Sequence, residues 1–125
     1  EPDLAQTFVA TCCGLGVKFR FDGLANLRVK ETDRIAALEN EMRKLGYVIG
    51  DTADGTLFWD GTLCSPQENA VIETYDDHRM AMSIAPLCIK TGGVLINNPQ
   101  VVAKSYPRYW DNLRAAGFVV EETSL

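Results

Sequence analysis

Basic side chains in this acidic sequence gather where helices are expected to begin. They are spread over three expected helix starts: Arg28, Lys30 and Arg34 at the first, His78 and Arg79 at the second, and Lys104 at the third. The free N–H groups of a helix start already carry partial positive charge, so added cations are unfavourable unless an anion completes the site. Arginine suits such a site because its planar fork can bind a carboxylate or a phosphate through two hydrogen bonds. Together the three helix starts predict one convergent anion-binding pocket.

The alternative is that each cation is a solvated surface charge paired with an acid nearby in the sequence. The acids available for such pairs are Glu31, Asp33, Asp76 and Asp77. Pairing suffices to explain any single cation, because exposed ion pairs of this kind are common and weak. The coincidence of three helix starts favours the pocket.

Two acids accompany these cations. Asp3 opens the first expected helix, and Glu31 follows Lys30 directly. A carboxylate held among lysine and arginine stays ionised, so it can take up a proton only as the transition state develops. For Asp3 the simpler explanation is a helix-start acid favoured by the helix dipole.

The elements that would position these groups alternate between helix and strand. Apolar residues at helical spacing predict helices that stop at Gly14 and Gly16, at Gly46, at 91–93 (TGG) and at Gly117. The expected N-caps are Thr32 or Asp33, Asp76 or Asp77, and Ser105, with Pro107 in the first turn of the last helix. Strands are expected at 17–21, 47–49, 56–59, 94–96 and 118–120. Glu39 and Arg43 are expected to pair on the solvent face of the second helix.

Length and composition limit the classes of protein. The chain has 125 residues, 46% of them hydrophobic and 23% charged, which is ordinary for one globular domain. Its formal net charge of −5 disfavours nucleic acid and anionic membranes as partners. No apolar run approaches the roughly 18 residues of a membrane span.

The cysteines and the single histidine do not suggest a metal site. Cys12, Cys13, Cys64 and Cys88 show no metal-binding spacing, and His78 is the only histidine. We expect reduced cysteines, no bound metal and no disulfide framework.

The sequence also contains an internal repeat. Residues 42–48 match residues 113–119, and Lys30 falls at the same place as Lys104. This pattern predicts two α/β units of roughly sixty residues, 1–62 and 63–125, stacked on a shared core. Chance similarity is the alternative, because short α/β units often look alike.

Four segments in order carry a resemblance to a known family. In the order of the motifs named next, they are residues 27–35 (LRVKETDRI), 76–82 (DDHRMAM) and 102–107 (VAKSYP), preceded in the chain by residues 2–5 (PDLA). They resemble the K-E-T-D-R, D-H-R-M-A-M, late-lysine and P-D-x-A motifs of the 5-enolpyruvylshikimate-3-phosphate synthases, the 3-phosphoshikimate 1-carboxyvinyltransferases. The sequence departs from that pattern at Asp76, where asparagine is common, and at Leu27, where an aromatic residue is common.

The resemblance implies a reaction. The family transfers the carboxyvinyl group of phosphoenolpyruvate to the 5-hydroxyl of shikimate 3-phosphate and releases phosphate, through a tetrahedral intermediate. It needs no metal or organic cofactor, works in the cytoplasm, supplies chorismate and the aromatic amino acids, and is the target family of glyphosate. Both substrates are polyanions, which agrees with the cationic helix starts.

The resemblance also implies residue roles. Asp3 would accept the proton of the attacking hydroxyl, Lys30 would hold shikimate 3-phosphate near the reacting centre, and Glu31 would handle protons at the methylene carbon. Asn26, with Asp3 and Lys30, would contact shikimate 3-phosphate.

The phosphoenolpyruvate clamp would consist of Arg34, Arg79 and Lys104, with His78 beside it in a supporting role. Such a clamp would neutralise a carboxylate and a phosphate and orient both reactants.

The family is larger than this chain. Its enolpyruvyl transferase fold has two domains, each of three βαβαββ units around a pseudo-threefold axis, with the substrates bound between them. Residues 1–125 would be about two units of the C-terminal domain, with the N-terminal domain absent. We therefore expect the isolated chain to be inactive. The alternative is a non-catalytic anion-binding module that retains half of the pocket.

Overall fold

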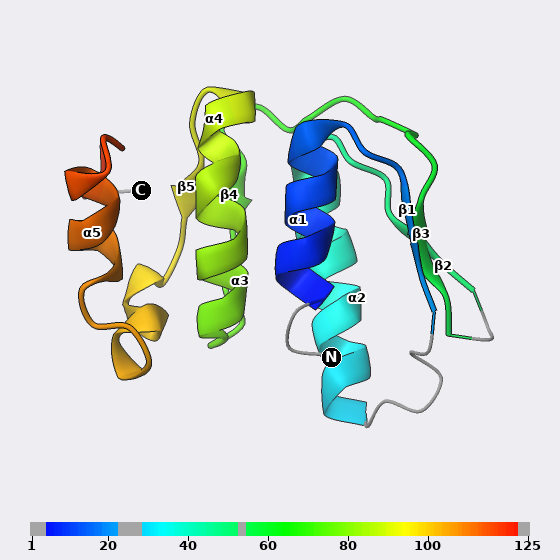
Figure 1. Ribbon diagram of the computed structural model, residues 1–125, viewed down its shortest axis with the longest axis horizontal. Coiled ribbons are helices and arrows are strands. Elements are labelled where there is room, and N and C mark those ends of the chain that lie inside the picture. The colour runs from blue at the N-terminus through cyan, green and yellow to red at the C-terminus, as the bar shows by residue number, and fades with distance from the viewer. Residues whose placement is uncertain (1–4, 23–28, 53–54, 123–125) are drawn as a thin grey trace.

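Helices and strands alternate along the chain (Figure 1). The structure is a computed structural model that describes residues 5–22, 29–52 and 55–122, without the side chains of residues 5, 29–33 and 104. The elements are α1 (Ala5–Leu15), β1 (Phe19–Phe21), α2 (Val29–Lys44), β2 (Gly50–Asp51), β3 (Leu57–Trp59), β4 (Val71–Ile72), α3 (His78–Ile84), α4 (Cys88–Thr91), β5 (Leu95–Ile96) and α5 (Tyr109–Ala115), with 3₁₀ helices η3 (Ala85–Leu87) and η4 (Pro99–Lys104). The α/β class expected from the sequence is confirmed.

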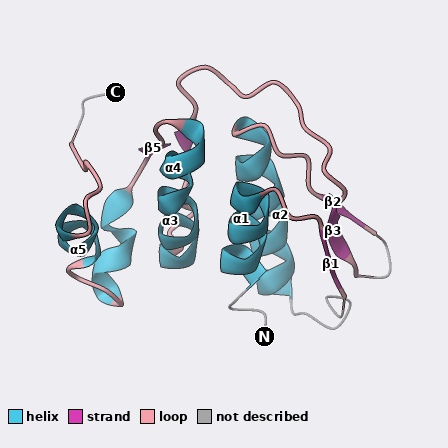
Figure 2. Ribbon diagram, turned by 45° about the horizontal axis from the view of Figure 1, so that its top comes forward, coloured by secondary structure: helices cyan, strands magenta, loops and turns pink. Residues whose placement is uncertain are grey.

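The strands form two small sheets. The first is antiparallel with the order β1-β3-β2, and the second pairs β4 with β5 in parallel. Parallel neighbours need a crossover connection, which α3, η3 and α4 supply. The three-stranded sheet, the α1–α2 pair, α3 with the β4–β5 sheet, and α5 follow one another along the long axis in both views (Figures 1 and 2).

One apolar core joins the two halves of the sequence. Its fully buried members come from α1, α2, β3, β4 and α3, and include Val9, Leu38, Met42, Leu57, Ile72, Met80 and Ile84. Fully burying such a side chain contributes about 1.5–3 kcal/mol to folding. A second cluster packs α3 against η4 and α5 through Ala81, Ala85, Val102 and Tyr109. The core therefore fixes α1, α2 and α3 against one another.

The helix start predicted for α3 is correct, and the one predicted for α2 is wrong. Asp77 caps α3, as one of the two expected residues. The cap expected at Thr32 or Asp33 is wrong, because α2 already begins at Val29 and both residues lie inside it. Lys30 and Glu31 are good helix formers, so nothing local stops the helix from extending.

The C-terminal part differs most from the expectation. Ser105 does not cap a helix, since it ends η4, and α5 begins only at Tyr109 without a side-chain cap. Pro107 restricts the residue before it to extended conformations, so one helix cannot run through both positions. Residues 118–120 form no strand, and 47–49 contributes only the bridge between Tyr47 and Leu63. Strand β4 was not expected from the sequence.

The matched segments 42–48 and 113–119 end their helices in the same way. Gly46 and Gly117 have φ of 101° and 105°. In both segments the N–H after the glycine donates five residues back, Tyr47 to Met42 and Phe118 to Leu113, each at 3.0 Å. This is the Schellman arrangement, which needs a left-handed residue and so favours glycine.

The two glycines allow a paired stability test. A Cβ at Gly46 would lie 3.0 Å from the Cys64 carbonyl oxygen, whereas one at Gly117 would meet nothing within 4 Å. We expect Gly117→Ala to lower the free energy of unfolding by about 1 kcal/mol, from the left-handed conformation alone. Gly46→Ala should cost about 2 kcal/mol, because the backbone near Cys64 must also shift. Urea unfolding of the two variants measures the difference, and equal losses would contradict the steric argument.

Glu39 is not the surface partner of Arg43 that the sequence predicts. No ion pair joins these two described residues, and Glu39 is half-buried with Asp51 near it. Burial, with a further contribution from the Asp51 charge, raises the pKa of Glu39 to about 7. An acid whose pKa is higher in the folded chain binds its proton more tightly there than in the unfolded chain.

The stability of the chain should therefore fall as the pH rises from about 4.5 through 7. We expect Glu39→Gln to remove this loss, so that the variant is about 1–2 kcal/mol more stable than the parent at pH 8. At pH 4.5 the two should be equal. Urea unfolding at both pH values checks this, with Glu68→Gln at an exposed position as the control. A stabilisation independent of pH would point to packing and not to charge.

Candidate functional site

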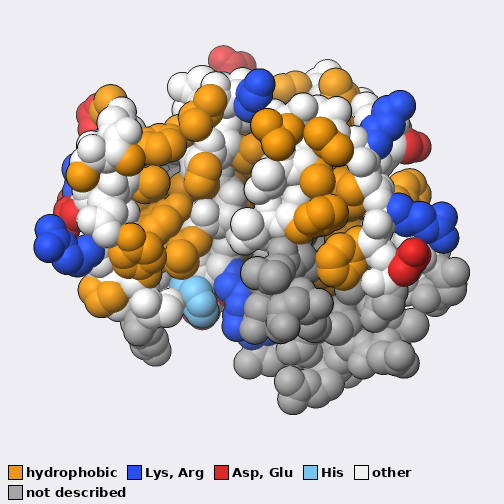
Figure 3. Space-filling view, in the orientation of Figure 1, with side chains coloured by type: hydrophobic (Ala, Val, Ile, Leu, Met, Phe, Trp, Pro, Cys, Tyr) orange, Lys and Arg blue, Asp and Glu red, His pale blue; other side chains and the backbone are white. Residues whose placement is uncertain are grey.

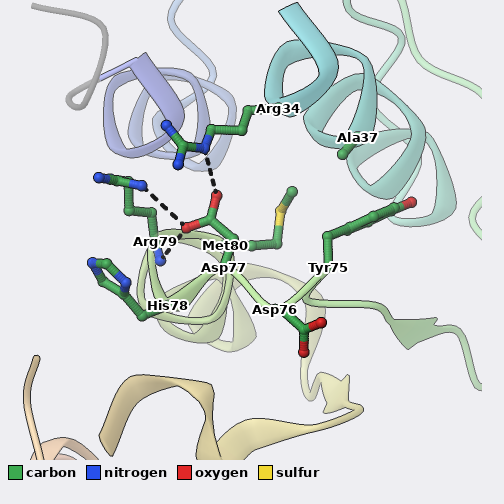
Figure 4. Close-up of a pocket in the computed structure, with 8 residues that line it drawn as sticks. All are labelled: Arg34, Ala37, Tyr75, Asp76, Asp77, His78, Arg79 and Met80. Carbon is green, nitrogen blue, oxygen red and sulfur yellow. Dashed lines mark hydrogen bonds and ion pairs between the residues drawn. The ribbon is translucent and has the colours of Figure 1, made fainter. Parts of the chain in front are cut away.

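A cavity of about 440 Å³ opens between α2 and the start of α3. It is lined by Arg34 and Ala37 of α2 and by residues 75–80 (Figure 4). In the space-filling view, basic side chains and a histidine gather at a hollow near the lower edge of the face shown (Figure 3).

Asp77 is the centre of this site. Its side chain is buried, and as the N-cap of α3 it accepts a hydrogen bond from the Arg79 backbone N–H at 2.9 Å. The other carboxylate oxygen accepts from Gln6 Nε2 of α1 at 3.0 Å. The Arg34 Nε lies 3.7 Å from Asp77 Oδ2, and an Arg79 guanidinium nitrogen lies 3.5 Å from Oδ1. One carboxylate thus joins three helices.

Arg34 and Arg79 converge on this carboxylate from opposite helices (Figure 4). Their side chains are 23% and 26% exposed, so each is partly withdrawn from solvent but open to the cavity. The pairing of cations with Asp77, which the sequence offered as the alternative to a pocket, is present. However, two guanidinium groups and one carboxylate still sum to a net positive charge. The arrangement can therefore bind an anion in addition to Asp77.

Two further polar side chains at the cavity, His78 and Asp76, point in different directions (Figure 4). The His78 ring is half-buried and lies beside Arg79, whereas Asp76 points away from both guanidinium groups (Figure 4). Asp76 is exposed and accepts a hydrogen bond from Asn98 Nδ2 at 3.2 Å. Its negative charge is thus directed away from the arginines.

The turn before Asp77 is strained and held from α2. Tyr75 and Asp76 both have left-handed backbones, with φ of 55° and 54°, which costs of order 1–3 kcal/mol per residue. Tyr75 donates to Glu41 Oε2 at 2.6 Å, and the Glu73 N–H donates to Glu41 Oε1 at 2.9 Å. Glu41 is fully buried and also accepts from Lys44 at 2.7 Å.

These contacts decide the charge state of Glu41. Burial alone would raise its pKa, but hydrogen bonds from Lys44, Tyr75 and the Glu73 backbone hold the pKa of Glu41 below its ordinary value. The carboxylate therefore stays ionised inside the fold and anchors the turn that leads to Asp77.

The structure brings together three of the residues predicted for the site: Arg34, His78 and Arg79. Asp3 and Asn26 lie outside the described residues. Lys30 and Glu31 lie in the first turn of α2, and Lys104 ends η4, but their side chains also lie outside the described part.

Two further properties concern the described residues only. Within 5–22, 29–52 and 55–122, His, Cys, Asp and Glu side chains form no group of three that could hold a metal ion. No helix in this part combines the length and apolar character that crossing a bilayer requires.

The chain matches one protein family over most of its length. The model of the family described as EPSP synthase (3-phosphoshikimate 1-carboxyvinyltransferase) matches residues 1–113. The chain belongs to the EPSP synthase family. A 3-phosphoshikimate 1-carboxyvinyltransferase of Bacteroides fragilis is 58% identical over 120 residues, which cover 96% of this chain and 29% of the relative. One of Pseudomonas syringae is 42% identical over 104 residues, or 82% of this chain and 25% of the relative.

A solved EPSP synthase has the same fold. The structure from Acinetobacter baumannii superposes with a TM-score of 0.71 at 28% identity, and the match covers 98% of this chain and 28% of that one. This chain thus spans about 29% of the length of the Bacteroides fragilis relative.

Two residues at the centre of this site were not predicted as site residues from the sequence. Asp77 was expected as a helix cap or as the ion-pair partner of a nearby cation, and Gln6 was not singled out. The N-cap position beside two basic residues was the available signal for Asp77. Gln6 had no local signal, because its partner lies 71 residues away.

Proposed function

We propose that this chain is the C-terminal part of an enzyme that transfers the carboxyvinyl group of phosphoenolpyruvate to the 5-hydroxyl of shikimate 3-phosphate. The observation that carries the proposal is the convergence of Arg34 and Arg79 on one buried carboxylate at the cavity. Membership of the EPSP synthase family supports it.

Phosphoenolpyruvate would bind through Arg34, Arg79 and Lys104. A bidentate guanidinium fits a carboxylate or a phosphate, and phosphoenolpyruvate carries one of each. Asp77 would orient the two arginines, and His78 would lie beside the bound phosphate or carboxylate. Neutralising both groups favours attack on the carbon that links them.

Proton transfer would come from the start of α1 and the first turn of α2. Asp3 would take the proton of the attacking hydroxyl as its oxygen bonds to the central carbon of phosphoenolpyruvate, while the methylene carbon gains a proton. Loss of a methyl proton and of phosphate would then restore the double bond. Glu31 would serve the methylene carbon, and Lys30 and Asn26 would hold shikimate 3-phosphate.

The architecture would be two βαβαββ-type units, 1–62 and 63–125, of a larger C-terminal domain in the enolpyruvyl transferase fold. The shared Schellman ends at Gly46 and Gly117 and the common core support this division. The substrates would lie between this domain and an N-terminal domain outside these 125 residues. We therefore expect the isolated chain to be inactive, because the half-pocket is open to water and its charges are screened.

A chimera tests the proposal directly. This chain would replace the 120-residue segment that it matches in the Bacteroides fragilis relative. Phosphate release from phosphoenolpyruvate would then be measured with and without shikimate 3-phosphate, for the chimera and for the chain alone. We expect release only from the chimera, and only with both substrates.

The other outcomes separate the alternatives. Release by the chain alone would show that no second domain is needed. A folded but inactive chimera, with a chain that still binds phosphoenolpyruvate, would favour a non-catalytic anion-binding module.

A further inference from the structure

Asp76 lies beside the cavity with its carboxylate turned away from both guanidinium groups (Figure 4). The side chain is exposed, and Oδ1 accepts a hydrogen bond from Asn98 Nδ2 at 3.2 Å. A carboxylate at the rim of an anion-binding cavity repels the anion more strongly the closer it lies, because like charges repel in inverse proportion to their distance. The direction of the Asp76 side chain therefore bears on the affinity of the cavity for an anion.

The amide of Asn98 is held so that its donor faces Asp76. Its Oδ1 accepts from Gln100 Nε2, which leaves the amide nitrogen for the carboxylate. The backbone of Asn98 has a left-handed φ of 57°, a conformation that asparagine adopts more readily than most residues. Its carbonyl oxygen accepts at 3.4 Å from the hydroxyl of Thr74, a residue that is 1% exposed. A buried side chain thus ties the start of η4 to the segment before Asp76.

We propose that Asn98 is a positioning residue that keeps the Asp76 carboxylate turned away from the anion-binding cavity. While the amide holds Oδ1, the negative charge of Asp76 stays on the side of the turn that faces η4. Without the amide, the net positive charge of the cavity would draw the carboxylate inward, where it would oppose the substrate anion. This inference rests on the proposed function, because the anion concerned is phosphoenolpyruvate.

Asn98→Gly removes the amide without straining the backbone, since glycine adopts a left-handed φ readily. In the chimera at low ionic strength we expect the KM for phosphoenolpyruvate to rise about three- to fivefold. The kcat and the KM for shikimate 3-phosphate should change by less than about twofold. The rise should shrink as salt is added, because salt screens the repulsion. Equal changes in both KM values would overturn the inference, because they would indicate a general loss of packing.

Asp76→Asn separates the charge from the fold. Asparagine has nearly the same shape as aspartate and tolerates the left-handed φ of 54° at this position, but it carries no charge. In an Asp76→Asn background, Asn98→Gly should change the KM for phosphoenolpyruvate by less than about twofold. A rise as large as in the parent would show that Asn98 acts through the backbone, and the inference would be wrong.

The neighbouring residue offers a matched control. Asn97 Nδ2 donates to both carboxylate oxygens of Glu73, at 2.9 and 3.0 Å, and Glu73 is not among the residues that line the cavity. Asn97→Ala releases a carboxylate between the same two segments and should leave the KM for phosphoenolpyruvate unchanged. If it raises this KM as much as Asn98→Gly does, the effect does not depend on Asp76 and the inference fails.

Binding of inorganic phosphate to the 125-residue chain tests the inference without activity. His78 is the only histidine in the sequence and lines the cavity, so its ring signals in ¹H NMR report binding there. We expect Asn98→Gly to weaken the apparent phosphate affinity about three- to fivefold, and to have no such effect in the Asp76→Asn background. Equal affinities in the parent and Asn98→Gly, or no phosphate binding by the parent, would refute the inference. An inactive chimera together with the expected phosphate affinities would count only against the proposed function.

Discussion

Arg34→Ala in the chimera should raise the KM for phosphoenolpyruvate by about ten- to a hundredfold, with little change in the KM for shikimate 3-phosphate. The range follows from the loss of a charged hydrogen-bonding group, which contributes about 1.5–3 kcal/mol. Arg79→Ala should act in the same direction, because its guanidinium approaches the same cavity and the same carboxylate. Steady-state kinetics with each substrate varied in turn measures both effects.

The identity of the group matters as well as its charge. Arg34→Lys keeps the charge but cannot bind a carboxylate through two parallel hydrogen bonds. We therefore expect a KM for phosphoenolpyruvate between those of the parent and Arg34→Ala. Arg114→Ala is the control, because Arg114 is exposed on α5 and pairs with Asp111 at 3.0 Å. If Arg34→Ala and Arg79→Ala barely move this KM, the clamp assignment is wrong.

The elements that present this clamp could be predicted from the sequence because their signals are local. Apolar spacing located α1, α2 and α3, and an acid before His78 and Arg79 marked the cap of α3. Cap and helix lie within a few residues of each other, so local preferences decide both.

The centre of the site could not be predicted because it depends on packing between distant segments. Gln6 meets Asp77 only because the core holds α1 against α3, and that contact spans 71 residues. The short strand β4 was not predicted either, because it also depends on a contact with a distant segment. Two residues carry no periodicity, and its pairing with β5 forms only after the crossover has folded.

Glu41 is a second buried acid whose contacts join segments that are distant in the sequence. Its carboxylate has no exposure, and it joins α2 to the segment that precedes Asp77 through Tyr75 and the Glu73 backbone. Lys44 supplies the compensating charge and also donates to the Val71 carbonyl at 3.1 Å. A buried ion that loses its partner is costly, because the remaining charge stays poorly solvated.

Glu41→Gln should lower the free energy of unfolding by about 3–5 kcal/mol at pH 7, the usual cost of breaking a buried pair. Because hydrogen bonds hold the pKa of Glu41 below its ordinary value of 4.5, its contribution is complete above that pH. The contribution is lost as the pH falls through the lower pKa of the folded chain. Urea unfolding at pH 7 and at successively lower pH values should therefore show the two proteins converging.

Tyr75→Phe is the matched control for this prediction, because it removes one hydrogen bond to Glu41 and keeps both the ring and the carboxylate. Its cost should be about 1 kcal/mol. A Glu41→Gln deficit that persists unchanged into acid would mean that the amide disrupts packing and that the charge has little role. Convergence in acid, with the smaller loss for Tyr75→Phe, would instead identify the ionised carboxylate as the anchor of the strained turn. The arginine clamp would then depend on Glu41 as well, since that turn sets the position of Asp77.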